Sequence, residues 1–229
     1  MKNKILETIQ NNKYFQHITS LDTEPVLIAG LYDANDVMLC TWEESGIDNE
    51  CTDLSALSKY PTTTKIIIPG SVTNIKFFNR DSITDVIILN GATRLAADAF
   101  KYCGNLRNVT LPNSITHISD TAFCDTALVN INIPNTVKSI GYRAFESCNF
   151  TTIVIPDSVT SIANAFSWCS ELQSVTLSNN LTSLGTYAFA NCYKLASITW
   201  KGKTYTNNVE FNTAVKNAGI ASDDVWVYV

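Results

Sequence analysis

The pattern of apolar and polar residues repeats about every 22 residues between Thr62 and Lys203. Each period contains a short alternating segment such as Asn108-Val109-Thr110-Leu111, in which Val109 and Leu111 point to one side. This alternation predicts one short β-strand in each period. Seven such strands are expected, with inner residues spaced by 21 to 23 positions: Ile68, Leu89, Leu111, Ile133, Ile155, Leu177 and Trp200.

Prolines end four of the predicted strands, because proline has no N–H group to donate to a sheet. They are Pro69, Pro112, Pro134 and Pro156. In two other units we place Asn90 and Ser178 at the proline position. The segment that follows, "NSITHI" in the third unit, is expected to turn Ile115 and Ile118 into the core.

The dipeptide Ala-Phe forms a second repeat in the same frame. Its phenylalanines are spaced by 21 to 23 residues: Phe100, Phe123, Phe145, Phe166 and Phe189. We predict that stretches such as "SDTAF" are short helical or 3-10 turns that lead the chain back to the next strand. The alanine allows a close approach and the phenylalanine fills the space between coils. Self-similarity at this period predicts a solenoid, in which each unit packs on the next.

A cysteine follows the Ala-Phe pair in four units, at Cys103, Cys148, Cys169 and Cys192. With this cysteine, units such as "LQSVTLSNNLTSLGTYAFANC" resemble the leucine-rich repeats of the BspA type, also called the Treponema-type class. The resemblance covers roughly 60% of the chain. It departs from the pattern at "FFNRD", where Ala-Phe is missing, and at Thr126, which stands in the cysteine position.

The resemblance implies a right-handed α/β solenoid with a parallel β-sheet on one face and short helical or 3-10 segments on the other. Residues outside the repeat are expected to cap its open ends, since an uncovered sheet edge invites pairing with other chains. We therefore expect three parts: 1–60 as an N-terminal helix, hairpin and cap, 61–203 as about seven repeat strands, and 204–229 as a C-terminal helix–strand cap.

Composition argues against several functions. The chain of 229 residues has 16 basic and 21 acidic residues and a net charge of −5, so it lacks the concentrated basic face that nucleic-acid binding requires. No apolar stretch is long enough to span a membrane. The first residues also lack the continuous apolar segment of a secretory signal peptide.

Catalytic or metal chemistry is not expected. The chain has seven cysteines but no Cys-x-x-Cys pair, only two histidines, and no glycine-rich phosphate loop. We interpret the repeated cysteines as small residues packed between coils, because cysteine is among the most buried residue types. Pairing of Cys40 with Cys51 in an oxidising compartment stays open. No cofactor and no enzymatic activity are therefore expected.

Two sets of residues are candidates for partner binding. The outward positions of the predicted strands form two columns of side chains on one face of the sheet. Toward the N-terminus these columns include Lys65, Ile67, Val86 and Ile88. The three apolar residues among them either belong to this exposed face or are covered by the N-terminal hairpin. Exposed aromatic residues after the Ala-Phe frames stack on sugars or anchor proteins, with core packing as the alternative. These aromatic candidates are Tyr102, Trp168 and Tyr193. The strand candidates are Asn108, Thr110, Asn130, Asn132, Thr152, Val154, Ser174 and Thr176.

The family's association with bacterial attachment to host proteins implies the leading hypothesis. It is a non-enzymatic binding or adhesion module of extracellular or cell-surface type, whose partner is a protein or a glycan. The alternative is a structural component of a phage particle, such as a tail-tip or receptor-binding protein, because no leader is visible. The sequence does not indicate an oligomeric state.

Overall fold

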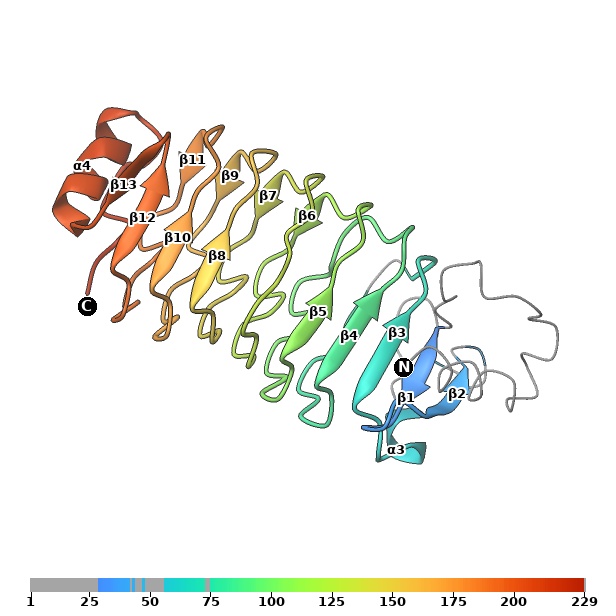
Figure 1. The fold of residues 1–229 in the computed structure, drawn as a ribbon. Helices are drawn as coiled ribbons and strands as arrows, with labels where there is room; N and C mark the ends of the chain where they lie inside the picture. Colours follow the sequence, from blue (N-terminus) through green and yellow to red (C-terminus); the bar gives the residue numbers. More distant parts are fainter. Residues whose placement is uncertain (1–28, 42, 44–46, 48–55, 73–74, 229) are drawn as a thin grey trace, which may run out of the picture.

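Residues 29–41, 43, 47, 56–72 and 75–228 are described by the computed structural model. They form a row of stacked coils with parallel strands on one face, as the repeat predicts (Figure 1). The helix expected near Ile5 and Ile9, and the possible partner Cys51, lie outside the described residues.

The face with the longer strands carries two sheets. The first has the order β2-β1-β3-β4-β5 and the second the order β13-β12-β10-β8. The repeat strands within them are β3 (Lys65–Ile68), β4 (Asp85–Ile88), β5 (Asn108–Thr110), β8 (Thr152–Val154), β10 (Ser174–Thr176) and β12 (Ser197–Trp200). Neighbouring repeat strands within each sheet are parallel and in register, one coil apart.

A third sheet lies along another face of the coils and has the order β11-β9-β7-β6. Its two-residue strands are β6 (His117–Ile118), β7 (Ser139–Ile140), β9 (Ser161–Ile162) and β11 (Ser183–Leu184). Each strand buries an Ile or Leu and directs its other residue outward. We call it the return sheet. It runs without a break from the third coil to the sixth (Figure 1).

The Ala-Phe segments are turns rather than the short helices expected from the sequence. In four of the five Ala-Phe units, the residues two positions before and two positions after the phenylalanine have positive φ, as at Thr121 (53°) and Asp125 (56°) on either side of Phe123. The left-handed conformation cannot continue a right-handed helix. A pair of such residues therefore bends the chain sharply around these four phenylalanines, and Trp168 alone does so after Phe166.

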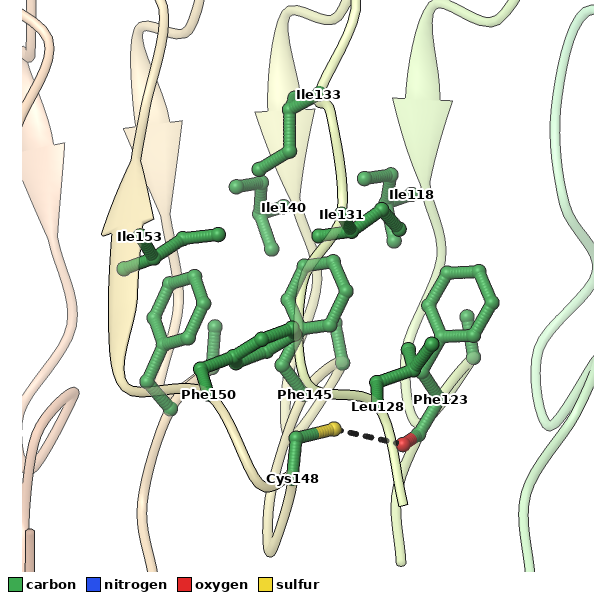
Figure 2. Close-up of a cluster of buried hydrophobic side chains, with 14 of the residues drawn as sticks. Ile118, Phe123, Leu128, Ile131, Ile133, Ile140, Phe145, Cys148, Phe150 and Ile153 are labelled. Atoms are coloured by element: carbon green, nitrogen blue, oxygen red, sulfur yellow. Dashed lines mark hydrogen bonds between the residues drawn. The ribbon is translucent and has the colours of Figure 1, made fainter. Parts of the chain in front are cut away.

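The phenylalanine rings form a continuous buried stack, which we call the phenylalanine spine. Neighbouring ring centroids are 5.2–5.9 Å apart and the ring planes are within 11° of parallel. Phe77 occupies the first position, so the "FFNRD" unit keeps the ring although it lacks the alanine. Figure 2 shows part of the spine at Phe123 and Phe145. The six members are Phe77, Phe100, Phe123, Phe145, Phe166 and Phe189.

The second coil has a different register from the expected one. Val86 lies between Ile66 and Val109 in the sheet and is buried, and Ile88 is buried as well. Both point into the core, so the outward residues of β4 are Asp85 and Ile87, and Leu89 rather than Asn90 follows the strand in the proline position. The expected outward positions of Val86 and Ile88 are therefore wrong, whereas Ile67 lies in register with the outward Ile87 and is buried.

Antiparallel strands flank the repeat. At one end, β1 (Gly30–Tyr32) pairs with β2 (Met38–Thr41) and with β3, and a short helix α3 (Ala56–Lys59) precedes β3. At the other end, β13 (Lys203–Tyr205) pairs with β12 and leads into α4 (Asn208–Asn217). The Asn207 side chain caps α4 by accepting hydrogen bonds from two backbone N–H groups.

The last coil is covered by the segment after α4. This segment is not a regular strand, but its carbonyl groups at Val225 and Val227 accept hydrogen bonds from the N–H groups of Phe189 and Asn191, at 2.7 and 2.9 Å. These are the same N–H positions that pair with the next coil elsewhere in the repeat. The terminal segment therefore satisfies donors that the end of the solenoid would leave exposed.

Candidate binding surface

The fourth of the seven expected strands is not formed. Ile131 and Ile133 are buried as predicted, but residues 129–133 adopt no strand. Within the described part of the chain, these residues make no backbone hydrogen bond to either adjacent coil. The sheet is therefore interrupted between β5 and β8, as Figure 1 shows.

Two features of the sequence account for the interruption. Asn130 and Asn132 flank Ile131, and asparagine is disfavoured in strands. Phe150 stands where the other units have a leucine: Leu106, Leu128, Leu172 and Leu195. The larger ring of Phe150 is fully buried and packs edge-to-face on Phe145 at 5.6 Å, so an aromatic ring replaces the leucine beside the fourth coil (Figure 2).

The interruption opens a cleft with a volume of about 430 Å³. Its polar groups are the amides of Asn130, Asn132 and Asn135 and the hydroxyl of Thr152, and its apolar rim includes Val154. Val154 is 64% exposed, although it is a large apolar residue in a strand. The cleft lies within the size range of small-ligand and side-chain pockets.

Four of the eight strand candidates line this cleft: Asn130, Asn132, Thr152 and Val154. Ser174 and Thr176 lie beside Thr152 and Val154 on the neighbouring strand β10, so they extend the same surface. Asn108 and Thr110 lie on β5, across the interruption, and the Asn108 amide donates to the Asp85 carboxylate at 2.8 Å. The eight residues thus share one face, with the cleft at its centre.

The three aromatic candidates do not form one site. Trp168 and Tyr193 contact each other edge-to-face, with ring centroids 6.3 Å apart. Tyr102 occupies the same place in its coil as Trp168 but lies three coils away, where it contacts Phe78 and has the Lys101 ammonium over its ring at 5.0 Å. A residue that the sequence did not indicate, Tyr228, stacks on Tyr193 at 5.9 Å.

The repeated cysteines are buried, as predicted, and they also act as hydrogen-bond donors. Each thiol lies 3.0–3.2 Å from the carbonyl oxygen of the spine phenylalanine in the preceding coil. Thr126, which replaces cysteine in its unit, donates to the carbonyl of Phe123 in its own coil at 2.9 Å. Burial raises the pKa of the Cys148 and Cys192 thiols to about 12, which keeps them protonated and unreactive.

The described residues hold no group of three or more His, Cys, Asp or Glu side chains placed to bind a metal ion. His117 is exposed, and its Nδ1 atom lies 2.8 Å from the hydroxyl of the neighbouring Thr116. In the same part of the chain, no helix has the length and apolar character that would let it cross a membrane.

Comparison with known proteins identifies the class. The family model of the BspA type leucine rich repeat region matches residues 49–107 and 93–212 in six copies, which is more than half of the chain. The chain therefore belongs to the BspA-type leucine-rich repeat family. It shows no significant similarity to any protein of the curated set.

Two solved structures share this fold. A leucine-rich repeat protein from Bacteroides ovatus is 26% identical, with a TM-score of 0.54 over 59% of this chain and 42% of that chain. The leucine rich repeat protein TpLRR of T. pallidum is 22% identical, with a TM-score of 0.60 over 70% of this chain and 86% of that chain. The chain therefore spans less than half of the Bacteroides protein.

Proposed function

We propose that this chain is a non-enzymatic binding module that recognises a protein partner through the outer face of its interrupted sheets. One observation carries the proposal: the interruption leaves one side of a strand unpaired beside an open cleft. β8 pairs with β10 on one side only, so its backbone groups on the side of the fourth coil have no partner strand.

The chemistry of the cleft favours a protein partner. Unpaired strand groups accept the backbone of an extended peptide, and nearby pockets select its side chains. The asparagine amides of the cleft both donate and accept hydrogen bonds, and Val154 offers an exposed apolar contact beside them. Ser174 and Thr176 continue the surface, so a partner larger than the cleft finds further polar contacts.

The setting that we propose is extracellular or on the cell surface, as the family's association with attachment implies. The Ser, Thr and Asn residues of the sheet face give an uncharged hydrophilic surface that suits this setting. The alternative role in a phage particle stays a prediction, and the neighbourhood of the gene tests it: tail and baseplate genes beside it would favour the phage.

The experiment is a binding screen of the chain against an array of extracellular-matrix and host-surface proteins, followed by variants. Asn132→Lys combined with Thr176→Lys should weaken the partner's affinity at least about tenfold, because two charges then meet the interface unpaired. Both positions are exposed, so the melting temperature should stay unchanged. Ser183→Lys on the return sheet is the matched control and should bind normally.

Equal affinity of the double lysine variant and the wild-type chain would place the partner elsewhere and contradict the proposal. A glycan that binds the chain and is lost in the same double variant would also contradict it, because the face would then be a sugar site.

A further inference from the structure

Three half-exposed aromatic side chains lie together near the C-terminal end of the solenoid. Trp168, Tyr193 and Tyr228 are 51%, 54% and 52% exposed. Tyr193 is the central ring: it is nearly parallel to Tyr228, at 13°, and nearly perpendicular to Trp168, at 75°. We call these three residues the aromatic corner.

The fold itself does not require a tryptophan in the corner. Trp168 has φ of 62°, in the left-handed region that disfavours bulky side chains. The equivalent positions of other coils have the same conformation, and three of them hold Asn79, Asp125 and Asn191, the residue types that adopt it most readily. Trp168 therefore adds backbone strain and exposes half of its side chain. Such strain is typical of residues that are retained for binding.

The size of the corner indicates the size of its ligand. Aromatic side chains present about 150–250 Å² each, so three half-exposed ones offer about 300 Å². A stable protein interface needs about 800 Å² on each partner. The corner alone is too small for a protein and matches a ligand of one or two rings.

The charges around the corner indicate a neutral ligand. Glu171 lies three residues after Trp168, and Lys194 directly follows Tyr193. The two side chains form an ion pair at 2.7 Å. The pair has no net charge, and its half-exposed groups can still donate and accept hydrogen bonds. Within the described residues, no Lys or Arg lies over any of the three rings, whereas Lys101 covers Tyr102.

We propose that the aromatic corner of Trp168, Tyr193 and Tyr228 binds neutral hexopyranose units of a glycan. A pyranose ring presents its C–H groups on one face, which stack on an aromatic ring, and hydroxyl groups around its rim. The rings of the corner supply the stacking faces, and the Glu171–Lys194 pair supplies partners for the hydroxyl groups. This site is separate from the cleft and does not depend on the proposed protein partner.

The test is titration of the 229-residue chain with six-unit oligosaccharides of glucose (β-1,4 and α-1,4), mannose, galactose and N-acetylglucosamine. Calorimetry gives the affinity, and the fluorescence change that the wild-type chain shows and Trp168→Asn lacks reports on Trp168, since that variant keeps Trp42, Trp200 and Trp226. We expect at least one oligosaccharide to bind and to change the emission. Trp168→Asn should weaken binding at least about tenfold, because a stacking ring is lost.

Trp168→Asn should also leave the melting temperature unchanged or raised, because asparagine suits the left-handed backbone. Tyr102→Asn is the matched control: it makes the same kind of replacement at the equivalent position outside the corner and should leave binding intact. Tyr193→Ser provides a second loss-of-binding variant.

Failure of the wild-type chain to bind any of these oligosaccharides would overturn the proposal. Equal binding by wild-type and Trp168→Asn chains would overturn it as well. If sedimentation showed a dimer that Trp168→Asn dissolves, the corner would be an interface between copies of the chain instead. The protein-partner assay with the double lysine variant changes two strand residues and none of the corner residues, so its failure is distinguishable from these outcomes.

Discussion

The Sγ atom of Cys148 lies 3.2 Å from the carbonyl oxygen of Phe123, one coil earlier in the solenoid (Figure 2). The same relationship links Cys169 to Phe145 and Cys192 to Phe166. Each of these carbonyl oxygens also accepts a hydrogen bond from a residue of its own coil, so the thiol of the next coil adds a second donor. The cysteine column therefore ties each coil that carries one of these cysteines to the coil before it, whereas Thr126 bonds within its own coil.

Replacing Cys148 by alanine should destabilise the protein. The change removes both a fully buried sulfur and a hydrogen bond to Phe123, and we expect a loss of about 1–2 kcal/mol in the free energy of unfolding. Urea denaturation measures it. Cys124→Ala is the control, since the Cys124 thiol bonds to the exposed Asp125 carboxylate, which water can solvate instead. Equal losses for the two variants would contradict a special role for the carbonyl bond.

Stability should fall in alkaline solution. Burial raises the pKa of Cys103 to about 11 and that of Cys148 to about 12, from an ordinary value of 9.0. Below pH 9 these thiols are protonated in the folded and unfolded chains alike, so their contribution is constant. Above it the unfolded chain loses protons that the folded chain keeps, and the free energy of unfolding decreases up to about pH 12.

Denaturant titrations between about pH 7 and pH 11 test this expectation. Cys148→Ala removes one of the titrating thiols, so its alkaline decline should be shallower than that of the wild-type chain. A decline of the same slope in both proteins would show that other groups cause it. Native Cys148 should likewise resist a thiol reagent that labels it in the unfolded chain.

The regular spacing predicts the solenoid correctly, but it predicts the wrong inward-facing residues for the strand of the second coil. The run from Val86 to Leu89 is apolar throughout, so alternation cannot decide which residues point inward. An even spacing favoured Leu89 as the inner residue. The coil is in fact uneven: Val86 follows its partner Ile66 by 20 residues and precedes Val109 by 23.

The cleft was less predictable than the face around it. Asn130 and Asn132 fit the repeat as outward residues, and Phe150 reads as a conservative replacement for leucine. Only the packing shows that these residues together interrupt the sheet. Tyr228 was missed for a related reason, because it lies 35 residues after Tyr193 and has no place in the repeat.

Phe150→Leu should close the interruption. A leucine restores the side chain that the neighbouring coils have at this position, so the fourth coil can approach β8 and pair with it. We expect backbone amides of Thr152–Val154 to exchange with solvent at least about tenfold more slowly, the factor that corresponds to 1.4 kcal/mol. Hydrogen exchange followed by mass spectrometry or NMR measures this protection. Binding of the protein partner at the cleft should weaken.

The reciprocal variant Leu172→Phe is the control for the effect of a large ring at this position of the repeat. It places a large ring between β8 and β10 and should speed exchange in β10. If Phe150→Leu leaves exchange unchanged, the ring is not the cause of the interruption. Asn130→Val with Asn132→Val then tests the contribution of the asparagines.

Gly70→Ala should be strongly destabilising. A Cβ atom at residue 70 would lie 1.7 Å from the backbone oxygen of Asn90 in the next coil, and a backbone atom cannot rotate away. We expect a loss of about 2 kcal/mol or more, measured by thermal or urea denaturation. At Gly104 the added Cβ would meet only the Asp81 side chain, at 3.2 Å. Gly104→Ala should therefore cost clearly less, and comparable costs would contradict the backbone clash.

The phenylalanine spine makes the length of this molecule adjustable. Every coil adds one ring to the same stack, so a coil gained or lost as a unit leaves each remaining ring with the same kind of neighbours. A coil gained or lost between the hairpin β1–β2 and the cleft would shift the two relative to each other by one strand spacing, about 4.8 Å. The distance between two ligands bound on different coils therefore changes in steps of one whole coil.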